Sequence, residues 1–183
     1  MNNLLPGLTD ESVEFFTHER NLRVIKGGKV VSFTDLPFST ISILKEEIKK
    51  SNCIQTALHD IHPTSEMKRV EQFAICRFGG LDMQGDIVNG ELQDGEYWDC
   101  PMRGKCNHEG ILCKLPVING SRINKQDVQL IKLSVTDKIN EVIADELQLP
   151  LGSFHLAKKY LYRKLGIQTK QELAVLAMKN NII

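Results

Sequence analysis

A stretch of 44 residues in the middle of the chain, Arg77 to Gly120, most constrains what this sequence can fold into. It holds eight glycines, two prolines and three cysteines, and its apolar residues show no helical period. Helical spacing of apolar residues is found on both sides of it. A stretch of this composition rarely orders without a cross-link or a bound ion. The sequence therefore predicts three parts, residues 1–76, a glycine- and cysteine-rich segment 77–119, and residues 120–183.

The cysteines of this segment follow a C-x5-C-x6-C pattern at Cys100, Cys106 and Cys113, and Cys76 lies upstream. Thiolates on a segment rich in turns can converge on one tetrahedral Zn²⁺, and the binding free energy orders the segment. We therefore expect these four cysteines to bind zinc, with His108 as the substitute for Cys76. The same four thiolates could instead hold an Fe–S cluster, and a set of ordinary buried thiols is the remaining alternative.

The N-terminal part mixes strand and helix patterns. Two runs of β-branched residues flank Gly27-Gly28 between Arg23 and Phe33, which predicts a β-hairpin. Cys53 stands alone in a helical stretch and is expected in the core. Helices are expected at Thr9–His18, Leu36–Lys50, Asn52–Ile61 and Ser65–Cys76. Together with the helical C-terminal part, this predicts an α+β fold.

The C-terminal part is predicted to be all α-helical. A break at Pro150 separates the second helix from the third, because proline cannot sit inside a helix. Thr169 is expected to cap the last helix, and Gly166 to end the third. The third helix should bury Phe154, Leu156, Leu161 and Leu165. The four expected helices are Lys125–Ser134, Asp137–Leu147, Ser153–Leu165 and Lys170–Met178.

The formal net charge of the whole chain is zero, which taken alone argues against a nucleic-acid partner. The charges are unevenly distributed, however. Residues 1–119 carry 13 basic and 17 acidic side chains, and residues 120–183 carry 10 basic and 6 acidic ones. Between Glu146 and Glu172 there are five basic residues and no acidic residue. Such an asymmetry favours polyanion binding by the C-terminal part.

The order of motifs in the C-terminal part points to a known family. Val142-Ile-Ala-Asp-Glu-Leu147 is followed by Leu149–Leu151, then by Tyr160-Leu-Tyr-Arg-Lys-Leu-Gly-Ile167 and Thr169-Lys-Gln-Glu-Leu-Ala174. From Asn140 to Ala177 the sequence resembles the LuxR (GerE-type) helix-turn-helix DNA-binding domain without a gap. It departs from that family at Pro150, where serine is usual.

The resemblance implies a four-helix domain in a transcriptional regulator, which reads duplex DNA through the helix 153–165. It also implies a possible homodimer through the helix 170–178. Carried over position by position, six residues face base edges or phosphates: Ser153, His155, Lys158, Lys159, Lys164 and Lys170. A compact helical bundle with a solvated basic face, or a sigma-factor region with the same helix-turn-helix, are the alternatives.

A different class of function is a metal-stabilised interaction module or anti-regulator that docks on the transcription machinery, for instance on RNA polymerase. The acidic N-terminal part keeps this alternative open. An enzyme is not expected, because the sequence shows no paired carboxylates, nucleophile elbow or phosphate-binding loop. No apolar run is long enough to span a membrane, and Met1 to Asp10 lacks the features of a secretory signal. We therefore expect a cytoplasmic protein.

Overall fold

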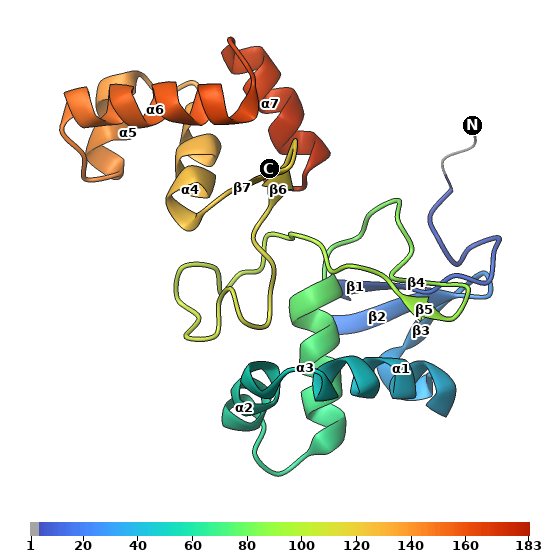
Figure 1. Ribbon diagram of the computed structural model, residues 1–183. Helices are drawn as coiled ribbons and strands as arrows, with labels where there is room; N and C mark the ends of the chain where they lie inside the picture. The colour runs from blue at the N-terminus through green and yellow to red at the C-terminus, as the bar shows by residue number, and fades with distance from the viewer. Residues whose placement is uncertain (1–3) are drawn as a thin grey trace. The chain divides into compact units, whose positions relative to one another are not determined.

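The computed structural model describes residues 4–183, which divide into two compact units with a boundary between Lys114 and Leu115. These residues form seven α-helices, one short 3-10 helix and small antiparallel sheets (Figure 1). The expected α+β class is confirmed. None of the helices in this part of the chain is long and apolar enough to cross a membrane.

The N-terminal unit contains a three-stranded antiparallel sheet of β1 (Glu14–His18), β2 (Asn21–Lys26) and β3 (Lys29–Ser32), in that order. Gly27 and Gly28 join β2 to β3 with φ of 57° and 75°, and Lys26 pairs with Lys29. Left-handed backbone at both turn positions suits the twist of the strands and favours glycine. The predicted hairpin is therefore confirmed.

The predicted helix over Thr9–His18 is wrong, because its second half is strand β1. Strand β1 pairs with β2, and Val13, Glu14 and Phe15 are all buried where it enters the core. The turn to β2 contains no glycine. Glu19 and Arg20 occupy it with φ of 49° and 66°, so the usual sequence signal of a two-residue hairpin turn is missing.

Three helices complete the core of this unit: α1 (Phe38–Lys49), α2 (Asn52–Ile61) and α3 (Glu66–Phe78). The short 3-10 helix η1 (Phe33–Asp35) leads from β3 toward α1. Helix α3 packs against β1 and β2, and α1 and α2 pack against α3. The fully buried side chains at the centre include Phe15, Phe33, Phe73 and Phe78, whose rings touch in a chain.

A second small hairpin follows α3. Strands β4 (Ile87–Val88) and β5 (Glu91–Leu92) are joined by Asn89-Gly90, both with positive φ. The bridge between Val13 and Ile87 attaches this hairpin to the residue before β1. Within the described residues, the chain from Gln93 to Pro116 forms turns but no helix or strand.

The C-terminal unit begins with the hairpin of β6 (Val117–Ile118) and β7 (Ser121–Arg122). The dipeptide Asn119-Gly120, near which the sequence placed the domain boundary, is the turn of this hairpin. Four helices follow, and Figure 1 draws them in yellow-orange to red. They are α4 (Lys125–Ser134), α5 (Asn140–Glu146), α6 (Leu151–Leu165) and α7 (Lys170–Lys179).

The ends of these helices follow capping chemistry. Thr169 accepts the backbone N–H of Glu172, whose carboxylate accepts the N–H of Thr169, so the expected cap of α7 is confirmed. Gly166 ends α6 in the left-handed region with φ of 70°, as expected. Helix α6 begins at Leu151 rather than Ser153, because Pro150 sits at the N-cap, where its missing N–H costs nothing.

Candidate nucleic-acid interface and cysteine cluster

The connection between α5 and α6 is tight. Gln148 turns the chain with φ of 55°, and the N–H of Leu149 donates to the carbonyl of Ala144 over 2.9 Å. Pro150 follows, and its carbonyl accepts the N–H of Phe154 at 3.0 Å. Helices α5 and α6 pack against each other, and α4 packs against α5 and α7. Two helices joined by a four-residue break, residues 147–150, are thus present at the predicted place.

One side of α6 holds it to the unit. Phe154, Leu161 and Leu165 are at most 1% exposed. Leu156, which we expected among them, is 52% exposed, so that prediction is wrong. The reason is helical geometry: Leu156 lies two positions after Phe154, and residues two apart point to different faces.

The exposed face of α6 is formed by residues spaced three and four apart. Leu156, Lys159, Tyr160 and Arg163 are all exposed. The guanidinium of Arg163 lies over the ring of Tyr160, 5.6 Å from its centre. Arg163 is not among the predicted DNA contacts, although its spacing of four residues from Lys159 indicates that both lie on the same face.

The six residues predicted to contact DNA divide into two groups. Ser153, His155 and Lys159 are exposed along α6. The other three are held in contacts within the unit. Lys158 donates to Asn140 Oδ1 at the start of α5 over 3.1 Å, Lys164 pairs with Asp127 Oδ2 at 2.7 Å, and Lys170 donates to the carbonyl of Thr136.

Lys158 is the most constrained of this second group. Its Nζ lies over the rings of Phe154 and Tyr162, at 5.7 and 5.8 Å from their centres. Burial, with a smaller effect of Lys170, lowers the pKa of Lys158 below that of an ordinary lysine. This side chain therefore joins α6 to the start of α5 and has less freedom to reach a phosphate than Lys159.

The N-terminal unit contains all five cysteines. Cys76 lies near the end of α3, and Cys100, Cys106 and Cys113 lie on the turns between β5 and β6. These four are half-buried. Cys53 on α2 is exposed, so its predicted core position is wrong.

The four half-buried thiols are close enough for a charge on one to affect the pKa of another. Burial raises the pKa of Cys76 to about 11, and Cys113, Cys100 and Cys106 add to this rise in that order. Two of the sulfur atoms accept hydrogen bonds from nitrogen. Gln72 Nε2 donates to Cys76 Sγ at 3.2 Å, and Arg103 Nη1 donates to Cys113 Sγ at 3.1 Å.

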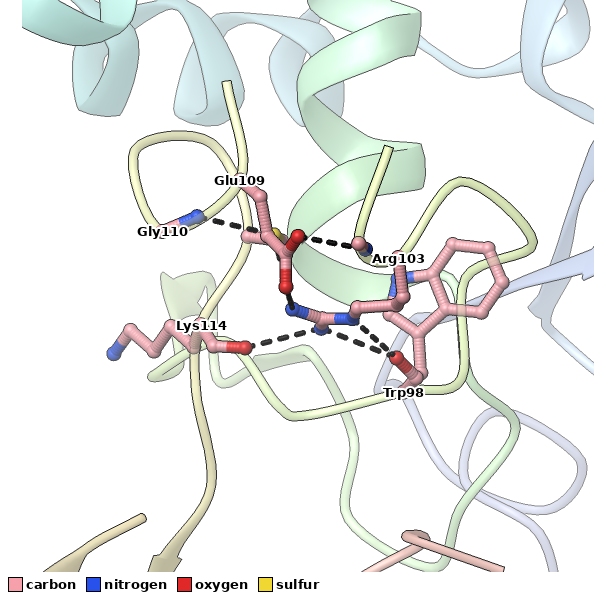
Figure 2. A network of polar contacts seen from close by, with 7 residues as sticks. Trp98, Arg103, Glu109, Gly110 and Lys114 are labelled. Carbon is pink, nitrogen blue, oxygen red and sulfur yellow. Dashed lines mark hydrogen bonds and ion pairs between the residues drawn. The ribbon is translucent and has the colours of Figure 1, made fainter. Parts of the chain in front are cut away.

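Arg103 is the centre of the polar network in Figure 2. Its Nε and Nη2 donate to the carbonyl of Trp98 at 3.2 and 3.1 Å, and Nη2 also donates to the carbonyl of Lys114 at 3.0 Å. The Glu109 carboxylate lies 3.9 Å from Nη1, and its other oxygen accepts the N–H of Gly104 at 2.8 Å. The side chains of Arg103 and Glu109 are 13% and 4% exposed. This network fixes the path of the chain from residue 98 to residue 114.

Among the residues that the structure describes, no three His, Cys, Asp or Glu side chains already stand in the arrangement of a metal site. His108, the alternative fourth ligand, lies half-buried in the turn after Cys106. The carbonyl of His108 accepts the N–H groups of Ile111 and Leu112. Leu112 is buried in the core of the unit, so this turn is anchored beside α3.

Trp98 packs against the end of α3. A Cβ added at Gly79 would lie 2.5 Å from the indole ring of Trp98. We expect Gly79→Ala to destabilise the N-terminal unit by about 1–3 kcal/mol, as in other overpacked sites. Trp98 is the single tryptophan of the chain, so its fluorescence during urea unfolding measures this unit.

The matched control for this substitution is Gly152→Ala. A Cβ at Gly152 would meet no atom within 4 Å, and its φ is not in the left-handed region. This variant should unfold like the wild type when followed by Trp98. Equal stability of Gly79→Ala and the wild type would contradict the packing of Trp98 described here.

A cluster of carboxyl groups lies beside β1. Burial raises the pKa of Glu14 to about 8, of Glu96 to about 9 and of Asp86 to about 10. Mutual repulsion, in which Asp82 takes part, adds to each rise. Asp86 accepts the N–H of Phe15 at 2.7 Å, whereas Glu14 Oε2 has no hydrogen-bond partner within the described residues.

The comparisons with known proteins add no further assignment: no family model, no curated protein and no solved structure matches this chain.

Proposed function

We propose that this protein is a transcriptional regulator that binds duplex DNA through its C-terminal unit, with α6 in the major groove. The observation that carries the proposal is the exposed side of α6. It presents Ser153, His155, Lys159 and Arg163 to solvent on a helix anchored from the other side by Phe154, Leu161 and Leu165. Helix α5 precedes it, separated by a four-residue break, which is the helix-turn-helix layout.

The electrostatics favour this partner. From Leu147 to Gln171 the chain has no acidic residue, so no carboxylate on α6 opposes a phosphate. Lys159 is exposed, and Arg163 extends from the same face. Lysine and arginine contacts to phosphates supply most of the affinity for DNA, whereas a few contacts to base edges supply the specificity. Ser153 and His155 lie in the first turns of α6, where base edges are usually reached.

Lys158, Lys164 and Lys170 have a different role in this proposal. Their contacts to Asn140, Asp127 and Thr136 connect α6 and α7 to the preceding helices. They hold α6 in position and add positive electrostatic potential near the DNA. Substituting them would therefore change the stability of the unit as well as its affinity for DNA.

One observation favours the alternative function of docking on another protein, such as RNA polymerase. Leu156 and Tyr160 are 52% and 56% exposed at the centre of the same face. In a DNA complex these side chains would contact thymine methyl groups or the sugar backbone. In a protein complex they would be the apolar centre of an interface.

A homodimer through α7 fits the same proposal. The family that the sequence resembles often uses this helix as a dimer contact, and Val175 and Met178 are exposed on α7. A dimer would place two copies of α6 in successive major grooves, about 34 Å apart. Its binding site would then contain two inverted half-sites, which selection from random duplexes would reveal.

The variant Lys159→Ala/Arg163→Ala tests the DNA proposal. Fluorescence anisotropy with labelled duplex DNA should show weaker binding, because the variant lacks two cationic side chains that are proposed to contact phosphates. The slope of log K against log salt concentration should become shallower by about 1 for each phosphate that the variant no longer neutralises. Neither side chain is buried, so the helical content should not change.

The matched control is Arg122→Ala/Lys179→Ala, which removes the same charge from exposed positions outside α6. It should retain most of the affinity for DNA. Equal loss in both variants would indicate an unspecific effect of charge and would contradict the assignment to α6. Binding of RNA polymerase without any binding of duplex DNA would favour the docking function instead.

A further inference from the structure

We propose that Cys76, Cys100, Cys106 and Cys113 together bind one Zn²⁺ that cross-links the turns of residues 98–114 to helix α3. This site belongs to the N-terminal unit and is independent of the DNA-binding function proposed for the C-terminal unit. Four thiolates form a closed zinc site, which is the type that stabilises a segment rather than catalysing a reaction.

The packing of the turns places the segment that carries three of the cysteines beside the helix that carries the fourth. The indole ring of Trp98 lies against Gly79, three residues after Cys76. At the other end of the turns, Leu112 is buried in the same core cluster that Cys76 contacts. The segment that carries Cys100, Cys106 and Cys113 is therefore anchored beside the end of α3 at both of its ends.

Two of the cysteines begin turns of the same form. The carbonyl of Cys100 accepts the N–H of Arg103 at 2.9 Å, and the carbonyl of Cys106 accepts the N–H of Glu109 at 3.2 Å. Each turn ends four residues after its cysteine at a glycine with positive φ, 79° at Gly104 and 86° at Gly110. A C-x3-G unit thus occurs twice, and each copy turns the chain immediately after its thiol. Turns of this kind let the backbone bend around an ion.

Two of the four sulfur atoms accept hydrogen bonds, as zinc-bound thiolates do. Cys113 Sγ accepts hydrogen bonds from Arg103 Nη1 at 3.1 Å and from the N–H of Gly110 at 3.5 Å. Cys76 Sγ accepts one from Gln72. Four thiolates around Zn²⁺ leave a net charge of two minus, and the half-buried guanidinium of Arg103 offsets part of it.

The segment also needs such a cross-link. Within the described part of the chain, residues 93–114 form no helix or strand, and the buried apolar residues among them are Tyr97, Trp98 and Leu112. Three buried side chains contribute little against the entropy of ordering this many residues. A structural zinc ion contributes its binding free energy to folding. Because the sulfur atoms are not yet in ligand geometry, binding requires the two C-x3-G turns to move toward Cys76.

Elemental analysis of the full-length protein, purified without chelators or a metal-affinity tag, tests the proposal. We expect one zinc per chain in the wild type. Cys106→Ser and Cys113→Ser should each lose most of it, and their loss should exceed that of the control Cys53→Ser, whose thiol is exposed on α2. His108→Ala should keep its zinc, because Cys76 is the fourth ligand in this proposal. Loss of zinc from His108→Ala with retention in Cys76→Ser would overturn that assignment.

A second measurement does not depend on how the variants fold. Wild-type protein treated with a chelator should unfold at a lower urea concentration when followed by Trp98 fluorescence, and added Zn²⁺ alone should restore the original midpoint. A wild-type protein without zinc, or with full zinc in Cys113→Ser, would overturn the proposal. A brown protein that contains iron and acid-labile sulfide would replace zinc by an Fe–S cluster on the same thiols. DNA binding is measured separately, and its loss would not affect this result.

Discussion

Replacing Arg103 by methionine is expected to lower the free energy of unfolding of the N-terminal unit by about 3–5 kcal/mol, the usual cost of breaking a buried ion pair. Methionine keeps much of the volume of the side chain but removes every donor. Glu109, whose side chain is 4% exposed, then loses its ion pair with Arg103, and the carbonyls of Trp98 and Lys114 lose the guanidinium as a donor. Urea unfolding followed by Trp98 fluorescence measures the loss.

Lys105→Met is the matched control for this prediction. Lys105 lies in the same turns, is exposed, and carries the same charge. Its replacement should change the free energy of unfolding by less than about 0.5 kcal/mol, as for most surface positions. A similarly small loss in Arg103→Met would show that Arg103 does not hold these turns together. Arg103→Lys should rescue little, because a lysine cannot donate in the directions of the guanidinium.

The stability of the N-terminal unit is expected to fall as the pH rises from about 5 to about 9, because of Glu14, Asp86 and Glu96. Their pKa values in the folded protein are about 8, 10 and 9, above those of ordinary carboxyl groups. At a pH between the ordinary pKa values of the unfolded chain and the raised pKa values of the folded protein, the folded chain binds more protons than the unfolded chain. Each group therefore removes up to about 1.4 kcal/mol of stability per pH unit in that range.

The isosteric variants Glu14→Gln and Asp86→Asn test this prediction. Each amide has the shape of the protonated carboxyl and cannot ionise, so the stability of each variant should depend less on pH. Above about pH 8 both should be more stable than the wild type. Exposed Glu91→Gln serves as the control, and its curve should run parallel to that of the wild type. Parallel curves for all three variants would contradict the raised pKa values.

The sequence predicts an element well where local chemistry decides it. Gly27-Gly28 supplies the left-handed turn of the β2–β3 hairpin, and Thr169 with Glu172 caps α7, so both could be predicted. Strand β1 was missed because its turn uses Glu19 and Arg20 in a conformation for which neither residue is a signal. The strands β4 to β7 have two residues each, too few to show a period.

In the candidate sites, too, features set by local spacing could be predicted, and features set by tertiary packing could not. Positions on α6 follow from helical spacing, so the exposure of Lys159 and the burial of Phe154 could be predicted. The contact of Lys158 with Asn140 could not, because it depends on how α5 packs against α6. The carboxyl cluster around Glu14 likewise joins residues far apart in the sequence. The partners of Arg103 are nearer, but they lie on irregular turns, where no spacing rule indicates which groups meet.

The proposed binding of duplex DNA by the C-terminal unit is tested by the salt dependence of binding by the wild-type protein. At low salt we expect binding to a mixture of random duplexes. The logarithm of the affinity should fall linearly with the logarithm of the salt concentration, with a slope of about −0.9 for each phosphate contact. Absence of binding at low salt, or an affinity that does not change with salt, would contradict the account.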